Sequence, residues 1–136
     1  MRYLLDTNVV SETKRKIPNQ GVIDFITKVN IDDIYFSCLT IGELKAGALK
    51  KAKTDPVAGK SIMKWIEDIL FASSDRIISV DLEACQKWAE FLAIDRTNAI
   101  DSLLAAQAAT NDMILVTRNV KHVQIFGVNC LNPFVE

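Results

Sequence analysis

Tyr3-Leu4-Leu5-Asp6-Thr7-Asn8 is the stretch that decides the fold, because an apolar run ends there abruptly on an acid. A short apolar run bounded by polar residues is typical of a buried strand. Runs of the same kind recur along the chain, and we predict further strands at Ile34–Phe36, Ile77–Val80, Met113–Thr117 and Gly127–Leu131.

Segments with helical periodicity separate these runs. Apolar residues recur at helical spacing between Val22 and Val29, and a single apolar stripe runs through Val57–Phe71. Other helices are predicted from Thr40 onward, after Asp81, and over Ala99–Thr110. Alternating strands and helices imply a mostly parallel sheet with helices on both faces. We therefore predict an α/β fold, a three-layer α/β/α sandwich with a roughly five-stranded sheet, as a single domain over residues 1–136.

The composition is that of a soluble globular protein, with 136 residues, 49% hydrophobic and 24% charged. No segment reaches the ~18 apolar residues of a membrane span, and no export signal is predicted. Cys38, Cys85 and Cys130 form no metal-ligand pair, so zinc is disfavoured. We expect them to be reduced thiols in the core of a cytoplasmic protein.

The net charge of −1 gives no global sign of nucleic-acid binding. Two local basic runs, Lys14–Lys16 and Lys50–Lys53, are candidate contacts for a phosphate backbone. Solvated helix ends are the favoured explanation of these runs, because most charge runs are only solvated faces.

Acids stand where strands end or helices begin. Asp6 ends the first strand, Glu43 and Asp101 are expected in the first turns of their helices, and Asn119 follows the fourth strand. Open parallel sheets bind ligands at the carboxyl ends of their strands. Each acid also has a structural explanation, since Thr40-x-x-Glu43 and Asn98-x-x-Asp101 resemble capping boxes and Asp6 can itself cap a helix.

Helix capping alone cannot explain why three carboxylates would lie close together, because it does not compensate their mutual repulsion. Two such charges 4 Å apart repel by on the order of 4 kcal/mol at an effective dielectric near 20. A bound divalent cation compensates this repulsion, and an all-oxygen site suits Mg²⁺ or Mn²⁺. Asp81 follows an expected edge strand and is interpreted only as a cap, while Asp112 precedes its strand and lies at the opposite edge.

Four motifs follow one another along the chain: Leu4-Leu5-Asp6-Thr7-Asn8-Val9-Val10-Ser11-Glu12, Ser37-x-x-Thr40-Ile41-Gly42-Glu43-Leu44-x-x-Gly47, Ala99-Ile100-Asp101-x-Leu103-x-Ala105-Ala106 and Leu115-Val116-Thr117-Arg118-Asn119. In this order they resemble the motifs of PIN-domain proteins, in particular toxins of the VapC/FitB type. The closing Val128–Phe134 is similar to the last strand and tail of that subgroup.

The resemblance implies a metal-dependent endoribonuclease, the toxin of a toxin–antitoxin pair, that cleaves RNA phosphodiester bonds with a metal-activated water and leaves a 5′-phosphate. It implies a cognate antitoxin, a homodimer, and operator DNA bound only through the antitoxin. The catalytic set carries over onto Asp6, Glu43, Asp101 and Asn119, and the first three are the expected ligands of Mg²⁺ or Mn²⁺. Residues expected to orient these groups or contact substrate are Thr7, Asn8, Thr117 and Arg118.

Two positions depart from the family pattern. Asn119 stands where an aspartate is common, which favours one firmly held metal over two, because an amide brings an oxygen but no charge. His122 stands near a place where relatives carry an acid, and we interpret it as structural or substrate-facing because imidazole suits softer ions than magnesium.

Two rival functions remain at this stage. A phosphatase with an aspartyl intermediate also places an acid after its first strand, although it requires an aspartate at position 8, which is Asn8. A catalytically weak PIN-domain module would act mainly through antitoxin and operator-DNA binding. The sequence also does not decide where the antitoxin binds. One set of apolar residues fits either a groove for an antitoxin helix or the core: Ile41, Leu44, Leu49, Ile62, Trp65 and Ile66.

Overall fold

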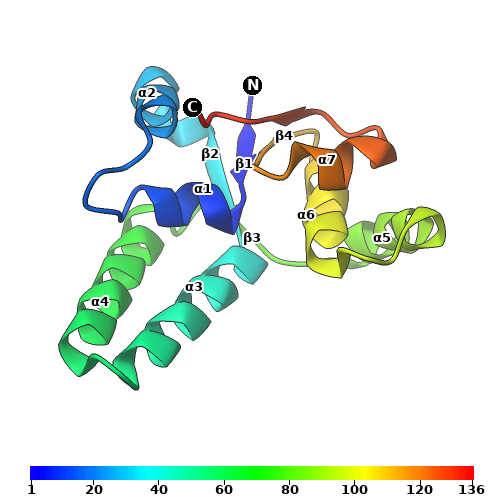
Figure 1. Ribbon diagram of the computed structural model, residues 1–136. Helices are drawn as coiled ribbons and strands as arrows, with labels where there is room; N and C mark the ends of the chain where they lie inside the picture. Colours follow the sequence, from blue (N-terminus) through cyan, green and yellow to red (C-terminus); the bar gives the residue numbers. More distant parts are fainter.

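Five parallel strands form one sheet in the order β3-β2-β1-β4-β5 in the computed structural model, which describes all 136 residues. The strands are β1 (Tyr3–Leu5), β2 (Ile34–Ser37), β3 (Ile77–Ile78), β4 (Ile114–Val116) and β5 (Cys130–Leu131). The register aligns Leu5 with Phe36 and Val116, so β1 and β4 end level and β2 runs one residue further, to Ser37 (Figure 1). The predicted α/β class and its parallel five-stranded sheet are confirmed.

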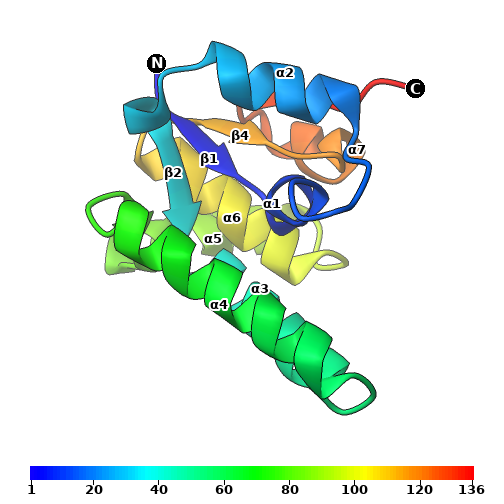
Figure 2. The same cartoon turned by 90° about the vertical axis from the view of Figure 1, so that its left-hand side faces the viewer.

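Helices cover both faces of the sheet, as Figures 1 and 2 show. They are α1 (Thr7–Glu12), α2 (Gln20–Lys28), α3 (Cys38–Ala52), α4 (Pro56–Ala72), α5 (Leu82–Ile94), α6 (Ala99–Thr110) and α7 (Val120–Val123), with short 3-10 turns at Ile31–Asp33 and Gln124–Phe126. The first four helices lie on one face and the last three on the other. The α3–α4 pair extends beyond the sheet as an antiparallel hairpin.

Two hydrophobic clusters fill the spaces between these layers. Leu5 points into the cluster formed with α1, α2, α3 and α4, where Val9 and Ile66 are fully buried. Leu4 points to the other face and packs with α5 and α6, where Leu104 is fully buried. Alternation along β1 therefore supplies both cores at once, as period-two geometry requires.

Several predicted boundaries needed correction. The last strand is limited to Cys130–Leu131, because Gly127, with φ 72°, closes a 3-10 turn in the left-handed conformation. The third strand is only Ile77–Ile78, although its predicted edge position is confirmed. α1 and α7 lack a sequence signal of their own, since six and four residues are too few to show helical periodicity.

The prediction that the cysteines lie in the core was wrong. Cys38 and Cys85 are exposed and Cys130 is half-buried, and none forms a disulfide. Cys38 begins α3 and Cys85 lies in the first turns of α5, each on the solvent side of its helix.

No helix is both long and apolar enough to cross a membrane.

Gly59 allows α4 to approach α3 closely. A Cβ atom at this position would lie 2.5 Å from Ala52 Cβ and 2.6 Å from Ala52 Cα. Because the second of these atoms belongs to the backbone, no side-chain rotation can relieve the clash. Gly42, within α3, has open space where its Cβ would be.

We predict that Gly59→Ala lowers the free energy of unfolding by about 1–3 kcal/mol, because overpacking forces the two helices apart. Gly42→Ala should instead raise it by up to about 1 kcal/mol, since alanine is the better helix former. Urea unfolding of both variants measures the difference. Equal stability of the two variants would contradict close packing at Gly59.

Candidate active site

Asp6 is the buried centre of the site, with only 6% of its surface exposed. Its backbone N–H continues the sheet by donating to the Val116 carbonyl at 2.9 Å, so the residue is fixed by the central strand pair. Its side chain accepts from the Thr7 backbone N–H at 2.7 Å and so caps α1. The capping role expected for Asp6 is confirmed, but it accounts for only one of the two carboxylate oxygens.

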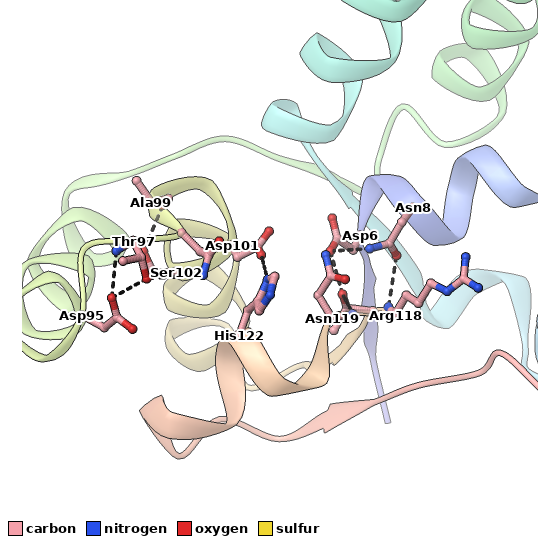
Figure 3. A network of polar contacts seen from close by, with 12 residues as sticks. Asp6, Asn8, Asp95, Thr97, Ala99, Asp101, Ser102, Arg118, Asn119 and His122 are labelled. Atoms are coloured by element: carbon pink, nitrogen blue, oxygen red, sulfur yellow. Dashed lines mark hydrogen bonds and ion pairs between the residues drawn. The ribbon is translucent and has the colours of Figure 1, made fainter.

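The second oxygen of Asp6 accepts from a residue that follows the neighbouring strand β4 and from a residue of α1. The Thr117 hydroxyl donates to Oδ2 at 2.7 Å, and the Asn8 amide donates to the same oxygen at 3.3 Å. Thr117 itself accepts from the Asn119 backbone N–H at 3.0 Å, and Asn8 accepts from the Arg118 N–H at 3.2 Å (Figure 3). These bonds join the ends of β1 and β4 into one network.

Glu43 joins the site through Thr7, whose hydroxyl donates to Glu43 Oε1 at 2.6 Å. The predicted capping box with Thr40 was wrong. α3 begins at Cys38 and is capped by Ser37, whose hydroxyl accepts from the Leu39 N–H at 3.1 Å. Glu43 therefore lies in the second turn, beyond reach of the helix start, and capping does not explain it.

Asp101 lies in the first turn of α6, as predicted, but it takes part in no capping box. The side chain of Asn98 makes no cap hydrogen bond. Asp101 Oδ2 instead pairs with His122 Nδ1 at 2.8 Å, and its carboxylate points toward Asp6 (Figure 3). The turn before α6 is ordered by Asp95, which accepts from the backbone N–H and hydroxyl of Thr97; these bonds lower the pKa of Asp95.

Asn119 and Arg118 enter the site differently. The Asn119 side chain makes no cap hydrogen bond to α7, which leaves its amide oxygen available beside Asp6 (Figure 3). The Arg118 guanidinium lies over the Phe134 ring, 4.5 Å from its centre, on the side of Asp6 away from Asp101. The backbone N–H of Arg118 thus belongs to the hydrogen-bond network of the site, whereas its guanidinium contacts the C-terminal segment.

Burial raises the pKa of Asp6 above its ordinary value. The carboxylates of Asp101 and Glu43 raise it further, whereas the hydrogen bonds from Thr117 and Thr7 lower it. The three acids thus interact electrostatically, and the ionised form of Asp6 is disfavoured where no cation is near.

A hard divalent cation fits the donors found here. Carboxylate oxygens of Asp6, Glu43 and Asp101 and the amide oxygen of Asn119 are ligands that Mg²⁺ and Mn²⁺ prefer. No three His, Cys, Asp or Glu side chains converge closely enough to hold an ion as they stand. Glu43 and Asp101 are accessible and each is held by one hydrogen bond, so rotation of these side chains toward Asp6 would complete a site.

One buried pair that braces the site was not foreseen. Ser37 donates its hydroxyl proton to Gln107 Oε1 at 2.5 Å, and both side chains are fully buried. The bond ties α6, which carries Asp101, to the start of α3, which carries Glu43. The available signal was a glutamine within the otherwise apolar stretch Leu103–Ala108 of α6.

Comparison with known proteins identifies the family. Residues 3–125 match the PIN domain. The chain belongs to the PIN domain family. It is 31% identical to plasmid stability protein StbB of Pseudomonas syringae, over 96% of this chain and 97% of that protein. It is 27% identical to VapC ribonuclease Y4jK of Sinorhizobium fredii, over 96% of each.

A solved relative of this PIN domain gives the same result. Toxin FitB of Neisseria gonorrhoeae is 28% identical over 96% of this chain and 97% of its own length. The crystal structure of FitAcB from that bacterium matches with a TM-score of 0.89 at 27% identity, covering 96% of this chain and 97% of that one. The resemblance to VapC/FitB-type proteins of toxin–antitoxin systems is therefore confirmed.

We predict that Asp6→Asn stabilises the metal-free protein at neutral pH. A group whose pKa is raised in the folded state adds stability below its unfolded pKa, near 3.8, and loses it as pH rises through the folded value. The variant should therefore melt a few degrees higher in chelator at pH 7, the shift that about 1 kcal/mol produces. The gain should shrink toward pH 4.

Asp81→Asn is the matched control. Asp81 also follows a strand and caps its helix, accepting from the Ala84 N–H at 2.9 Å, but it is exposed. Since asparagine caps helices as well as aspartate, little change is expected. A lower melting temperature for Asp6→Asn than for the wild type at pH 7 would contradict a disfavoured buried charge.

Proposed function

We propose that this PIN-domain chain, one nuclease domain over residues 1–136, is a Mg²⁺- or Mn²⁺-dependent endoribonuclease and the toxin of a toxin–antitoxin pair. The observation that carries the proposal is the buried Asp6, whose raised pKa reflects burial and the nearby Asp101 and Glu43. Relatives named as a VapC ribonuclease and as toxin FitB support the same activity.

The proposed reaction is hydrolysis of an RNA phosphodiester. Asp6, Asp101 and Glu43 would hold the cation, with the Asn119 amide oxygen beside them. When bound, the cation supplies the positive charge that lowers the pKa of an attacking water and stabilises the leaving oxygen. Thr117 and the Thr7 N–H fix both oxygens of Asp6, and His122 fixes the orientation of Asp101.

Cleavage of an end-labelled RNA tests this proposal. With Mg²⁺ or Mn²⁺ the wild type should cut internally and leave 5′-phosphates, and chelator should stop it. Asp6→Asn and Asp101→Asn should each lower the rate by about 100-fold or more, because each removes a charge that holds the cation. Asp81→Asn should keep the wild-type rate. Full activity in chelator or in either site variant would overturn the mechanism.

Metal titration separates this function from the alternative, a catalytically weak module acting through antitoxin and operator DNA. A nuclease should gain thermal stability as Mn²⁺ rises, because an ion that binds only the folded state stabilises it. Asp6→Asn should lose that gain. No Mn²⁺ effect on the wild type would favour the module, and trapping of a phosphate mimic on Asp6 would favour a phosphatase.

The antitoxin partner is proposed to bind an apolar cavity between α2, α4 and β2. Of the six candidate residues, Leu44 and Ile66 belong to the core, Leu49 is exposed, and the others are half-buried. Trp65 lines a cavity of about 390 Å³ together with Val10, Ile26, Phe36 and Ile69. Such a lining suits the apolar face of an antitoxin helix.

We also expect a homodimer, contact with operator DNA only through the antitoxin, and a cytoplasmic location.

Ile69→Glu tests the antitoxin cavity, because a charge there should block an apolar helix. The variant should lose co-purification with the DNA-binding protein expected to be encoded immediately upstream, by about tenfold or more. Leu49→Glu, exposed on α3 and outside the cavity, is the control and should retain it. Equal retention by both variants would move the antitoxin to another surface.

A further inference from the structure

A groove leads from the acidic site to a cluster of cations. Its near part, about 320 Å³, is lined by Thr7 and Glu43 of the site and also by Lys14 and Lys51. The same two lysines line an adjoining hollow of about 760 Å³ with Arg15 and Lys16. The two basic runs, separate in sequence, are thus brought together where α1 lies beside the α3–α4 hairpin (Figure 1).

The cations of this groove are largely unpaired. Lys14, Lys16 and Lys51 take part in no salt bridge, and Arg15 pairs only with Glu12, at 3.5 Å, with two-thirds of the Arg15 side chain exposed. Lys51 stands in the last turn of α3, where the helix dipole favours a cation. That interaction leaves the donors of its ammonium group free for a ligand.

The turn that carries Lys14, Arg15 and Lys16 is held in place by the side chain of Glu12. Glu12 is buried, and its Oε2 accepts from the Asn19 backbone N–H at 2.8 Å across the turn. Its Oε1 lies 3.5 Å from the Arg15 guanidinium. A pre-ordered turn spends less entropy when it binds a ligand, which distinguishes this cluster from a loose charged loop.

We propose that this groove holds the phosphates of a single-stranded RNA on one side of the bond to be cut. The inference rests on the proposed nuclease function, because Thr7 belongs both to the groove and to the hydrogen-bond network of Asp6 and Glu43. A strand with a phosphate at the acids would place its neighbouring phosphates at Lys14 and Lys51. A protein of net charge −1 needs such a local path to hold a polyanion.

The test measures binding of a fluorescein-labelled single-stranded RNA 20-mer of mixed sequence, in EDTA so that no cleavage occurs. Lys14→Gln/Lys51→Gln should weaken binding about tenfold or more at ~0.1 M salt. It should also reduce the slope of log affinity against log salt by about 1.4, since each lost phosphate contact in a single strand contributes ~0.7. Lys28→Gln/Lys87→Gln, with the same charge change on α2 and α5, should leave both values unchanged.

The outcomes separate this inference from the proposed function. If the Lys14→Gln/Lys51→Gln variant shows the predicted loss of RNA affinity and of salt slope, but the wild type does not cleave RNA in Mg²⁺, the groove stands and the nuclease function is rejected. Cleavage by the wild type with equal binding by both double variants would overturn the groove and leave the nuclease. Loss of poly-L-glutamate binding alone in the Lys14/Lys51 variant would also overturn it, in favour of an acidic protein partner.

Discussion

The hydrogen bond from Thr117 to Asp6 is the contact on which the rest of the site depends. It joins residues 111 positions apart in sequence, at the ends of two strands that are neighbours in the sheet. Because β1 is the central strand, Asp6 is covered from both sides and loses its water. The parallel sheet therefore determines the electrostatics of the site, before any metal or substrate is considered.

A buried carboxylate with acidic neighbours is a cost to the fold, and the surroundings offset only part of it. Thr117 and the Thr7 N–H favour the ionised form, yet burial and the nearby Asp101 and Glu43 outweigh them. Capping α1 would need only a single exposed acid, as Asp81 demonstrates for α5. Under the proposed function, the excess negative charge serves to bind a cation, at a cost in stability that is usual at active sites.

Sequence patterns predicted the elements better than their connections. The helix from Ala99 to about Thr110 was predicted correctly, because Asn98 at its start and its alanine-rich composition agree. Glu43 was misread as part of a capping box, since Ser37 and Thr40 are both good caps and only the end of β2 decides between them. The His122–Asp101 pair could not be predicted, because it depends on how α7 packs beside α6. The exposed cysteines of α3 and α5 were misplaced because a lone small side chain gives no indication of which face of a helix it lies on.

His122 and Asn119 together explain how the site can manage with few acids. Asn119 contributes an oxygen without charge, and the imidazole of His122 occupies one oxygen of Asp101. An additional carboxylate at either position would add repulsion around an Asp6 that is already disfavoured as an anion. The three acids, one amide and one imidazole therefore carry less mutual repulsion than a ring of carboxylates would. Under the proposed nuclease function, this balance suits a site that holds one cation, with the substrate phosphates bound by the lysines of the adjoining groove.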